Sequence, residues 1–298
     1  LVTTTYNRAG VVGRAIESVL AQEFEDWELV VVDDASTDST REVVDSYTDR
    51  RLSYFRLDSN HGVLAAKNYG LDRALGSWIG LLDSDDALLP GALGEVMSLT
   101  DGLPHEPGTV IGNCVYSSDG SPSGRGAFGS GFLRFEDFLC GRISGEFWGV
   151  FSSRALAGRR FDPRLRGIER MLWLKLWKES ATYYLDRPLL IKHRSEDSLT
   201  RPSNMIGDAA AVARSYGSFL GTFGRDIEKV CPRQIAYYLR RKGYFEIVSG
   251  RRRTGLSDVI RSFSHHLSGE GVGLLGAGMV LPKSLIARIG EGRRAVTS

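Results

Sequence analysis

The 298-residue chain has few cysteines and no recognisable pattern among them. The three residues, Cys114, Cys140 and Cys231, are widely separated and follow no metal-ligand spacing. An odd and scattered set argues against a disulfide framework and is typical of proteins in a reducing compartment. We therefore expect three structural thiols.

The sequence also lacks long apolar runs and a visible signal peptide. No stretch reaches the ~18–20 apolar residues that a membrane-spanning helix requires. The chain starts inside a predicted strand and without an initiator methionine. We therefore expect a few native residues to precede it.

The net charge is small, +2, but it is unevenly distributed. Residues 201–298 contain 16 Lys and Arg against 7 Asp and Glu, whereas residues 1–200 contain 22 against 29. An acidic part followed by a basic tail suggests a metal site in the first and an anionic surface partner for the second. The basic clusters are not interleaved with stacking aromatic residues, which argues against nucleic acid as that partner.

The first hundred residues alternate short β-branched runs with segments of helical periodicity. We expect strands at residues 1–5, 27–32, 52–57 and 78–82, and helices at residues 11–21, 36–47, 62–74 and 90–99. This alternation predicts an α/β fold with a mostly parallel sheet flanked by helices.

The later sequence continues the pattern less regularly. Further strands are expected near residues 109–115, 147–151, 182–185 and 189–192, and helices near residues 135–139 and 169–178. The Gly- and Ser-rich residues 117–131 form either a loop near the site or a simple surface connection. Beyond residue 201 the pattern is helical and basic, so we expect one domain at residues 1–200 and a C-terminal helical appendage at residues 201–298.

Polar clusters follow three of the predicted strands, at residues 4–7, 33–34 and 83–86. In an open parallel sheet, ligands bind beyond the carboxyl ends of the strands. We therefore expect these clusters to lie along one rim of the sheet.

The cluster at residues 83–86 contains three carboxylates, Asp83, Asp85 and Asp86, whose mutual repulsion a cation would relieve. A hard divalent ion such as Mn²⁺ or Mg²⁺ takes oxygen ligands and keeps positions open for substrate phosphates. Such an ion also stabilises charge on a leaving group. The alternative is an Asp-rich turn that caps the following helix.

Two other places offer nucleotide contacts. Asp33 and Asp34 end the second predicted strand, where a carboxylate can accept from a base N–H or a ribose hydroxyl, and we favour Asp34. The alternative role for this pair is to cap the helix that follows. Lys67 follows several small residues in a predicted helix, and its ammonium either approaches a nucleotide or is solvated.

Four segments together match the pattern of a known family: residues 4–7, 31–38, 60–70 and 83–86. In order and spacing they closely resemble the motifs of family 2 glycosyltransferases, which are inverting, nucleotide-sugar-dependent enzymes of the GT-A fold. The four segments together are highly specific, whereas each alone is not.

The resemblance implies roles for the residues at the rim. Thr4 and Tyr6 would flank the nucleobase, usually uracil, with Asp34 bonded to it. Asp85 would touch ribose or metal, and Asp85 or Asp86 would ligate Mn²⁺ or Mg²⁺. The full set of expected nucleotide-binding residues is Thr4, Tyr6, Asp33, Asp34, Lys67, Asp83 and Asp85.

The catalytic base departs from the family pattern. An inverting transfer needs a carboxylate to take the proton of the acceptor hydroxyl, and the family carries it in a Glu-Asp pair. Residues 161–165 and 173–176 match the flanking segments, but the pair itself reads Ile168-Glu169-Arg170 and one residue is missing. Counting back from residues 173–176 puts Glu169 at the base position, whereas counting forward from residues 161–165 puts Arg170 there. We assign Glu169; the alternative is an ordinary helix-start glutamate in an impaired enzyme.

Two residues remain open. His193 follows a predicted strand where related enzymes often carry a His near the diphosphate, but it is equally consistent with a surface residue. Trp148, in a predicted strand near Glu146, either stacks on a sugar ring on the acceptor side or packs in the core.

The resulting prediction is inverting transfer of one sugar from a UDP-sugar to a hydroxyl of a saccharide or lipid-linked saccharide, in cell-surface glycan or polysaccharide biosynthesis. A processive synthase is disfavoured, because neither spanning helices nor a Gln-x-x-Arg-Trp signature is found. One alternative is a catalytically impaired nucleotide-sugar-binding module. Another is a nucleotidyltransferase, which would need a Gly-rich phosphate loop that residues 6–10 do not supply.

The basic tail suggests a second kind of contact. Residues 272–281 are its most apolar stretch, and Lys283 and Arg288 follow. Such a segment can lie on an anionic membrane surface, which would put a cytoplasmic protein at the inner face of the membrane. The alternative is an appendage that packs on the catalytic domain or forms an oligomer contact.

Overall fold

The computed structural model describes residues 1–100, 103, 106–166, 170–193 and 202–294. Contacts divide the chain into two compact units. The sheet unit comprises Leu1–Phe138, Arg142–Pro163 and Leu172–Ser195, and the helical unit comprises Leu139–Gly141, Arg164–Met171 and Glu196–Ser298. The domain boundary expected near residue 200 falls on residues 194–201, which lie outside the described part.

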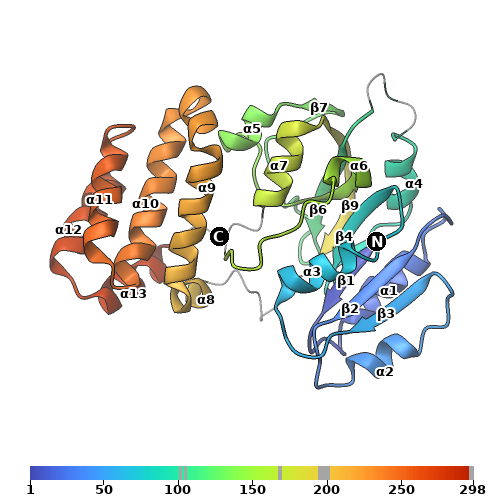
Figure 1. Ribbon diagram of the computed structural model, residues 1–298. Helices are drawn as coiled ribbons and strands as arrows, with labels where there is room; N and C mark the ends of the chain where they lie inside the picture. The colour runs from blue at the N-terminus through green and yellow to red at the C-terminus, as the bar shows by residue number, and fades with distance from the viewer. Residues whose placement is uncertain (101–102, 104–105, 167–169, 194–201, 295–298) are drawn as a thin grey trace. The chain divides into compact units, whose positions relative to one another are not determined.

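Four parallel strands form the first half of the sheet. Their order is β3 (Leu52–Arg56), β2 (Leu29–Asp33), β1 (Val2–Thr5) and β4 (Trp78–Asp83). The intervening helices are α1 (Val12–Leu20), α2 (Thr40–Asp45) and α3 (Val63–Leu71) (Figure 1). The α/β class and the parallel first half of the sheet are thus confirmed.

The second half of the sheet is mixed. Next to β4 lies β8 (Phe147–Ser152), which is antiparallel to it, followed by β6 (Thr109–Tyr116) and β9 (Thr182–Lys192). Two short strands, β5 (Ala87–Leu88) and β7 (Gly131–Leu133), pair antiparallel with β9. The strands expected at residues 182–185 and 189–192 form one strand, which an irregularity opposite Asn113 interrupts.

Helices cover both faces of the sheet, and this explains the unbroken apolar run in β2. Leu29 and Val31 face one core cluster, with α1, α2 and α4 (Ala92–Met97). Val30 and Val32 face the other, with α3, α6 (Ser153–Leu156) and α7 (Met171–Glu179). A strand buried on both faces needs apolar side chains at every position. A further short helix is α5 (Phe135–Leu139).

The helical unit is built from six helices among its described residues: α8 (Pro202–Gly207), α9 (Ala209–Val230), α10 (Pro232–Val248), α11 (Arg252–Phe263), α12 (Gly269–Val280) and α13 (Lys283–Arg294). Rings of Phe219 and Tyr238 meet between α9 and α10, with centroids 4.5 Å apart. Where α10 meets α11, an added Cβ on Gly243 would come within 2.7 Å of the Gly255 carbonyl oxygen. None of the described helices is both long and apolar enough to cross a bilayer.

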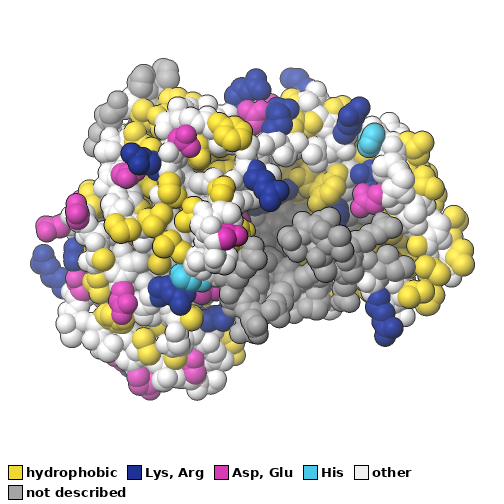
Figure 2. All heavy atoms as spheres, turned by 180° about the vertical axis from the view of Figure 1, so that it is seen from behind, with side chains coloured by type: hydrophobic (Ala, Val, Ile, Leu, Met, Phe, Trp, Pro, Cys, Tyr) yellow, Lys and Arg dark blue, Asp and Glu magenta, His cyan; other side chains and the backbone are white. Residues whose placement is uncertain are grey.

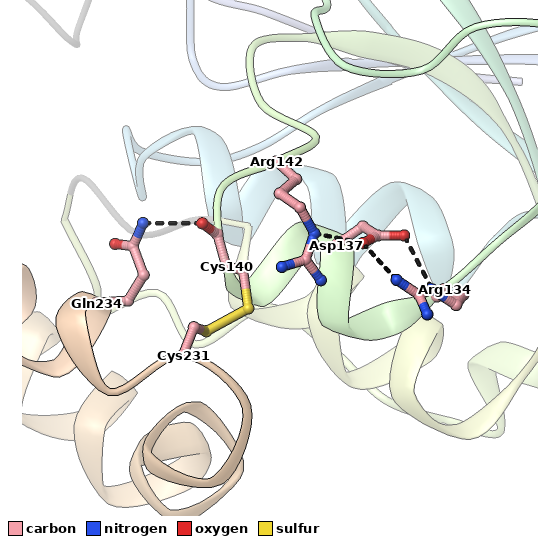
Figure 3. Close-up of a disulfide and its surroundings, with 6 residues drawn as sticks. All are labelled: Arg134, Asp137, Cys140, Arg142, Cys231 and Gln234. Atoms are coloured by element: carbon pink, nitrogen blue, oxygen red, sulfur yellow. Dashed lines mark hydrogen bonds and ion pairs between the residues drawn. A yellow bond between two sulfur atoms is a disulfide. The ribbon is translucent and has the colours of Figure 1, made fainter.

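The expectation of three free thiols was wrong for two of them. Cys140 and Cys231 form a disulfide within the helical unit, with Cα atoms 5.5 Å apart (Figure 3). Beside it, the Gln234 amide donates to the carbonyl oxygen of Cys140 at 2.9 Å. Because 91 residues separate the partners, only the folded chain brings them together. The disulfide also removes the cysteine argument for a reducing compartment, while Cys114 is free and buried.

Candidate active site

The expected rim forms where β2, β1 and β4 end side by side. Thr5 pairs with Asp33 across β1 and β2, and Thr4 pairs with Asp83 across β1 and β4. Parallel pairing aligns the carboxyl ends of neighbouring strands. The clusters at residues 4–7, 33–34 and 83–86 therefore lie at one edge of the sheet (Figure 1).

The two carboxylates after β2 differ in their surroundings. Asp33 is fully buried and accepts from the Ser36 hydroxyl and the Tyr54 hydroxyl, each at 2.5 Å. Asp34 accepts from the backbone N–H groups of His61 (2.8 Å) and Gly62 (2.7 Å), in the turn that opens α3. Asp33 thus stabilises the ends of the strands through hydrogen bonds, whereas Asp34 stabilises the turn beside the rim.

The turns after β1 and β2 adopt unusual backbone conformations. Asn7 has φ 52° and Ala35 has φ 65°. Residues other than glycine rarely adopt this left-handed backbone conformation. The Asn7 side-chain oxygen accepts from the Thr37 N–H at 2.7 Å, which ties the two turns together. Non-glycine residues in this region cluster at functional sites. Next to Asn7, the Tyr6 side chain is 44% exposed, while Thr4 in β1 is buried.

Lys67 is paired with the first carboxylate of the Asp83–Asp86 turn. Its Nζ donates to Asp83 Oδ1 at 2.8 Å from α3. Lys67 lowers the pKa of Asp83 below its usual value, against the opposing effect of desolvation. Protein atoms crowd around the Asp83 side chain, yet 48% of its surface is accessible to solvent. The ion pair brings Lys67 to the rim and leaves room for a ligand.

The other two carboxylates of this turn are held differently. Asp86 is 3% exposed and accepts from Lys192 Nζ and from the backbone N–H of His193, each at 3.0 Å. Burial raises the pKa of Asp86 to about 6, although Lys192 opposes the shift. The Arg14 guanidinium donates to the backbone oxygen of Asp85 at 3.0 Å. Among the described residues, no side chain donates to the Asp85 carboxylate. The carboxylate of Asp85 is therefore available to a ligand, as is the half-exposed Asp83.

Sequence reasoning missed a second ammonium, Lys192, and its partner Glu146. Lys192 Nζ lies 3.0 Å from Asp86 Oδ2 and 2.8 Å from Glu146 Oε2. Desolvation alone would lower the pKa of Lys192, but Asp86, Glu146 and Asp83 together outweigh it and raise the pKa. The only sequence signal for Lys192 was its position directly before His193 at a predicted strand end.

The remaining candidates have definite places. His193 follows β9; desolvation and the charge of Arg14 lower its pKa, while Asp85 opposes them. Trp148 lies in the core, 6% exposed, and its indole N–H donates to the Leu81 carbonyl oxygen at 2.8 Å. Trp148 thereby fixes β4 two residues before the acidic turn.

The proposed base cannot be placed, because Glu169 lies outside the described residues. Its neighbour Arg170 is described and belongs to the helical unit. There its guanidinium donates to the Tyr238 hydroxyl at 2.6 Å.

Comparison with known proteins identifies the family. The model of glycosyl transferase family 2 matches residues 1–155, which include the three strand-end clusters, Lys67 and Glu146 but not Lys192 or His193. The chain belongs to glycosyl transferase family 2. It is therefore a glycosyltransferase, and the fold is the GT-A fold of that family.

Individual relatives extend over the whole chain. The GalNAc(5)-diNAcBac-PP-undecaprenol beta-1,3-glucosyltransferase of Campylobacter jejuni is 29% identical over 316 residues, covering 99% of this chain and 97% of that protein. The structure of S. aureus TarS 1-349 in complex with UDP-GlcNAc has a TM-score of 0.63 at 16% identity, covering 99% and 90%. The mannosyltransferase PcManGT of Pyrobaculum calidifontis, in complex with GDP-Man and Mn²⁺, has a TM-score of 0.55 at 16% identity, covering 97% and 85%.

The rim of this glycosyltransferase could supply part of the coordination shell of a divalent metal ion. Within the described residues, no group of three or more His, Cys, Asp and Glu side chains could hold an ion by itself. Mg²⁺ at phosphate sites is commonly bound through one or two carboxylates, with phosphate oxygens and water completing the shell. The Asp85 carboxylate, with the accessible Asp83 beside it, offers such a partial set. Both oxygens of Asp86 are already bonded.

Proposed function

We propose that this family 2 glycosyltransferase transfers one sugar from a UDP-sugar to an acceptor hydroxyl, with inversion at the anomeric carbon. The observation that carries the proposal is the juxtaposition, at one strand end, of the Lys67–Asp83 ion pair with the Asp85 carboxylate, to which no described side chain donates. An ammonium and a carboxylate that can hold a metal suit a diphosphate leaving group. The UDP-GlcNAc complex of TarS supports UDP as the nucleotide.

The rim offers a place for each part of the donor. The nucleobase would lie between Thr4 and the exposed ring of Tyr6, near the turn that Asp34 holds. Asp83 is accessible to the ribose, and Lys67 would offset phosphate charge. Fixed charges positioned before the reaction stabilise a transition state more than mobile solvent does.

Mn²⁺ or Mg²⁺ is the proposed cofactor, with Asp85 as its protein ligand. The ion, when bound, would neutralise charge on the diphosphate. Asp86, the other expected ligand, accepts hydrogen bonds from Lys192 and from the backbone of His193, so we propose Asp85 ahead of it. The His193 imidazole lies near enough to Asp85 for the charge of Asp85 to affect its pKa, and we assign it to the diphosphate side.

The chemistry is a single displacement. The acceptor oxygen attacks the anomeric carbon as the bond from that carbon to the phosphate oxygen breaks. The nucleoside diphosphate leaves with the electron pair, and a carboxylate takes the proton of the acceptor hydroxyl. We assign that carboxylate to Glu169.

The donor site is testable by calorimetry with UDP, GDP and TDP, with and without Mn²⁺. We expect UDP to bind best and only in the presence of Mn²⁺. Asp85→Asn should weaken binding in Mn²⁺ by about 10–100-fold, corresponding to a charge-assisted interaction of roughly 1.5–3 kcal/mol. The matched control is Asp45→Asn, an exposed carboxylate that is paired with Arg41 on α2. Equal UDP binding without the ion would overturn the metal assignment.

Turnover separates an enzyme from a binding module. We expect Glu169→Gln to abolish sugar transfer while leaving UDP-sugar binding intact. If the wild-type protein binds UDP-sugars but transfers sugar to no acceptor in a broad panel, the impaired module becomes the better description.

The acceptor is proposed to be a lipid-linked saccharide in cell-surface glycan synthesis. The C. jejuni relative, similar over 99% of this chain, is named for an undecaprenol-linked acceptor. A lipid-linked acceptor requires the enzyme to work at a membrane surface.

A surface of the helical unit suits that requirement. Four apolar side chains in and around α12 are exposed, which we call the α12 patch: Leu267, Val272, Met279 and Val280. The basic residues Arg253, Arg261 and Lys283 on the neighbouring elements α11 and α13 are exposed as well. Hydrophobic side chains gather at the edge of this unit in Figure 2. Apolar and basic groups together bind anionic lipid.

Vesicle flotation tests the membrane contact. We expect the full chain to float with phosphatidylglycerol vesicles more than with phosphatidylcholine vesicles. Met279→Glu with Val280→Glu should reduce flotation, whereas Leu75→Glu, at an isolated apolar residue of the sheet unit that is 89% exposed, should not. Equal flotation of the wild type and both variants would show that the α12 patch is not the membrane-binding surface.

A further inference from the structure

Glu146 lies at the rim although it is far from the acidic turn in sequence. It directly precedes β8, and β8 is antiparallel to β4, with Gly80 opposite Val150 and Trp78 opposite Ser152. An antiparallel neighbour begins where its partner ends. The start of β8 therefore lies beside the end of β4, where the acidic turn begins.

The backbone at Glu146 is held rigidly. The Ser123 hydroxyl donates to the Glu146 carbonyl oxygen at 2.8 Å. The preceding Gly145 has φ +87°, and an added Cβ would lie 2.1 Å from the Ser123 carbonyl oxygen. Only glycine permits this approach, so the chain direction at Glu146 is fixed while its side chain stays 59% exposed.

The Glu146 carboxylate is oriented but not saturated. Lys192 Nζ contacts Oε2 at 2.8 Å, and the same ammonium holds Asp86 at 3.0 Å. An ionised carboxylate has about four lone-pair sites. Lys192 is the one side-chain partner of this carboxylate among the described residues, which leaves several of these sites open to hydroxyl donors. Sugars supply such donors in adjacent pairs.

The order of strands along the rim matches the order of groups in a nucleotide sugar. Asp34 follows β2, the Lys67–Asp83 pair lies at the end of β4, and Glu146 precedes β8, the next strand in the sheet. Neighbouring strands are about 4.8 Å apart, so about one strand interval separates Glu146 from the strand end where Lys67 would offset the phosphate charge. The group attached to the diphosphate is the sugar.

We infer that Glu146 binds hydroxyl groups of the transferred sugar and determines which sugar is accepted, with Lys192 as its positioning residue. This inference rests on the proposed donor site. The competing interpretation is a structural ion pair, and exposed pairs of that kind contribute little. Lys192, however, is only 22% exposed and bridges two carboxylates of which one, Glu146, faces solvent.

Comparison of UDP with UDP-sugars isolates the sugar contact. We expect Glu146→Ala to bind UDP with Mn²⁺ like the wild type, but to bind the preferred UDP-sugar about tenfold more weakly. Discrimination between UDP-glucose and UDP-galactose should narrow, and Glu146→Gln should recover part of the affinity. The matched control is Glu106→Gln, an exposed glutamate that is paired with Arg154.

The outcomes distinguish this inference from the proposed function. Suppose that the wild type binds UDP and that Glu146→Ala has wild-type affinity for both UDP and UDP-sugars. Only the sugar contact is then refuted. An equal loss for both ligands also refutes it, since the effect would then be structural. If the wild type binds no UDP, both proposals fall.

A double-mutant cycle tests the positioning role of Lys192. If Lys192 acts on the sugar through Glu146, the UDP-sugar-specific losses in Lys192→Met and Glu146→Ala should not add in the double variant. The KM of Lys192→Arg for the donor should stay closer to the wild-type value than the KM of Lys192→Met. Additive losses would mean that Lys192 contacts the ligand independently.

Discussion

Single residues at the rim differ in how far they are open to a ligand because their hydrogen-bond partners differ, although most of them are aspartates. Asp33 is saturated by hydroxyl groups inside the protein, and Asp86 is bonded at both oxygens. Asp85 keeps its carboxylate unbonded among the described side chains, and Asp83 shares one oxygen with Lys67. A ligand can therefore be recognised by the last two without the loss of a structural hydrogen bond.

Lys67 gives the first prediction. Lys67→Met removes the ammonium that offsets both Asp83 and the donor phosphates. We expect affinity for UDP in Mn²⁺ to fall about 10–100-fold, as expected for a charge-assisted contact worth roughly 1.5–3 kcal/mol. Calorimetry measures it, with Lys175→Met, at an exposed position on α7, as the control. Similar affinities for the two variants would leave Lys67 with only a structural role, as the ion-pair partner of Asp83.

At the scale of elements, the site depends on how closely α3 packs against the sheet. An added Cβ on Gly70 would lie 2.3 Å from Val2 Cγ1 and 3.3 Å from Val32 Cγ2. Glycine thus lets the helix that carries Lys67 approach β1 and β2. The same helix begins at the turn that Asp34 holds, so its position and the rim are coupled.

The second prediction concerns this contact. Gly70→Ala should lower the free energy of unfolding by about 1–3 kcal/mol, since overpacking forces the helix or strand to shift. Gly94→Ala in α4, where nothing lies within 4 Å of the added Cβ, should instead be neutral or stabilising by up to ~1 kcal/mol. Urea denaturation of both variants measures the difference. A similar effect of the two substitutions would show that α3 does not need the close approach.

At the scale of the whole molecule, the cysteines divide into a cross-link and a protected thiol. The Cys140–Cys231 bond closes a loop of 91 residues, and such long loops lose considerable chain entropy on closure. Cys114 lies behind the rim in the sheet unit, where desolvation raises the pKa of its thiol to about 12.

The third prediction is a labelling pattern. Iodoacetamide at pH 8 should label no cysteine in the native protein, because a buried thiol with a pKa of about 12 forms almost no thiolate. In denaturant without reductant, mass spectrometry should find one label, on Cys114, and after reduction three. Three labels without reductant would mean that Cys140 and Cys231 are not bonded.

Much of the sheet unit was predictable because its signals are local. The strands and helices of the first hundred residues were anticipated from periodicity, except for the short strand β5. Parallel topology alone gathered residues 4–7, 33–34 and 83–86. Element ends were less accurate: the helix expected at residues 90–99 spans Ala92–Met97. Helix ends depend on capping and tertiary contacts as well as on apolar spacing.

The sequence by itself determined the α/β class, the family and the acidic cluster at a strand end, because each depends on patterns that are local in the chain. Only the tertiary structure decided what pairs across long separations. The antiparallel placement of β8 brings Glu146 to Lys192, and the helical unit brings Cys140 to Cys231. No local periodicity encodes such contacts, since they depend on which segments become neighbours when the core is buried.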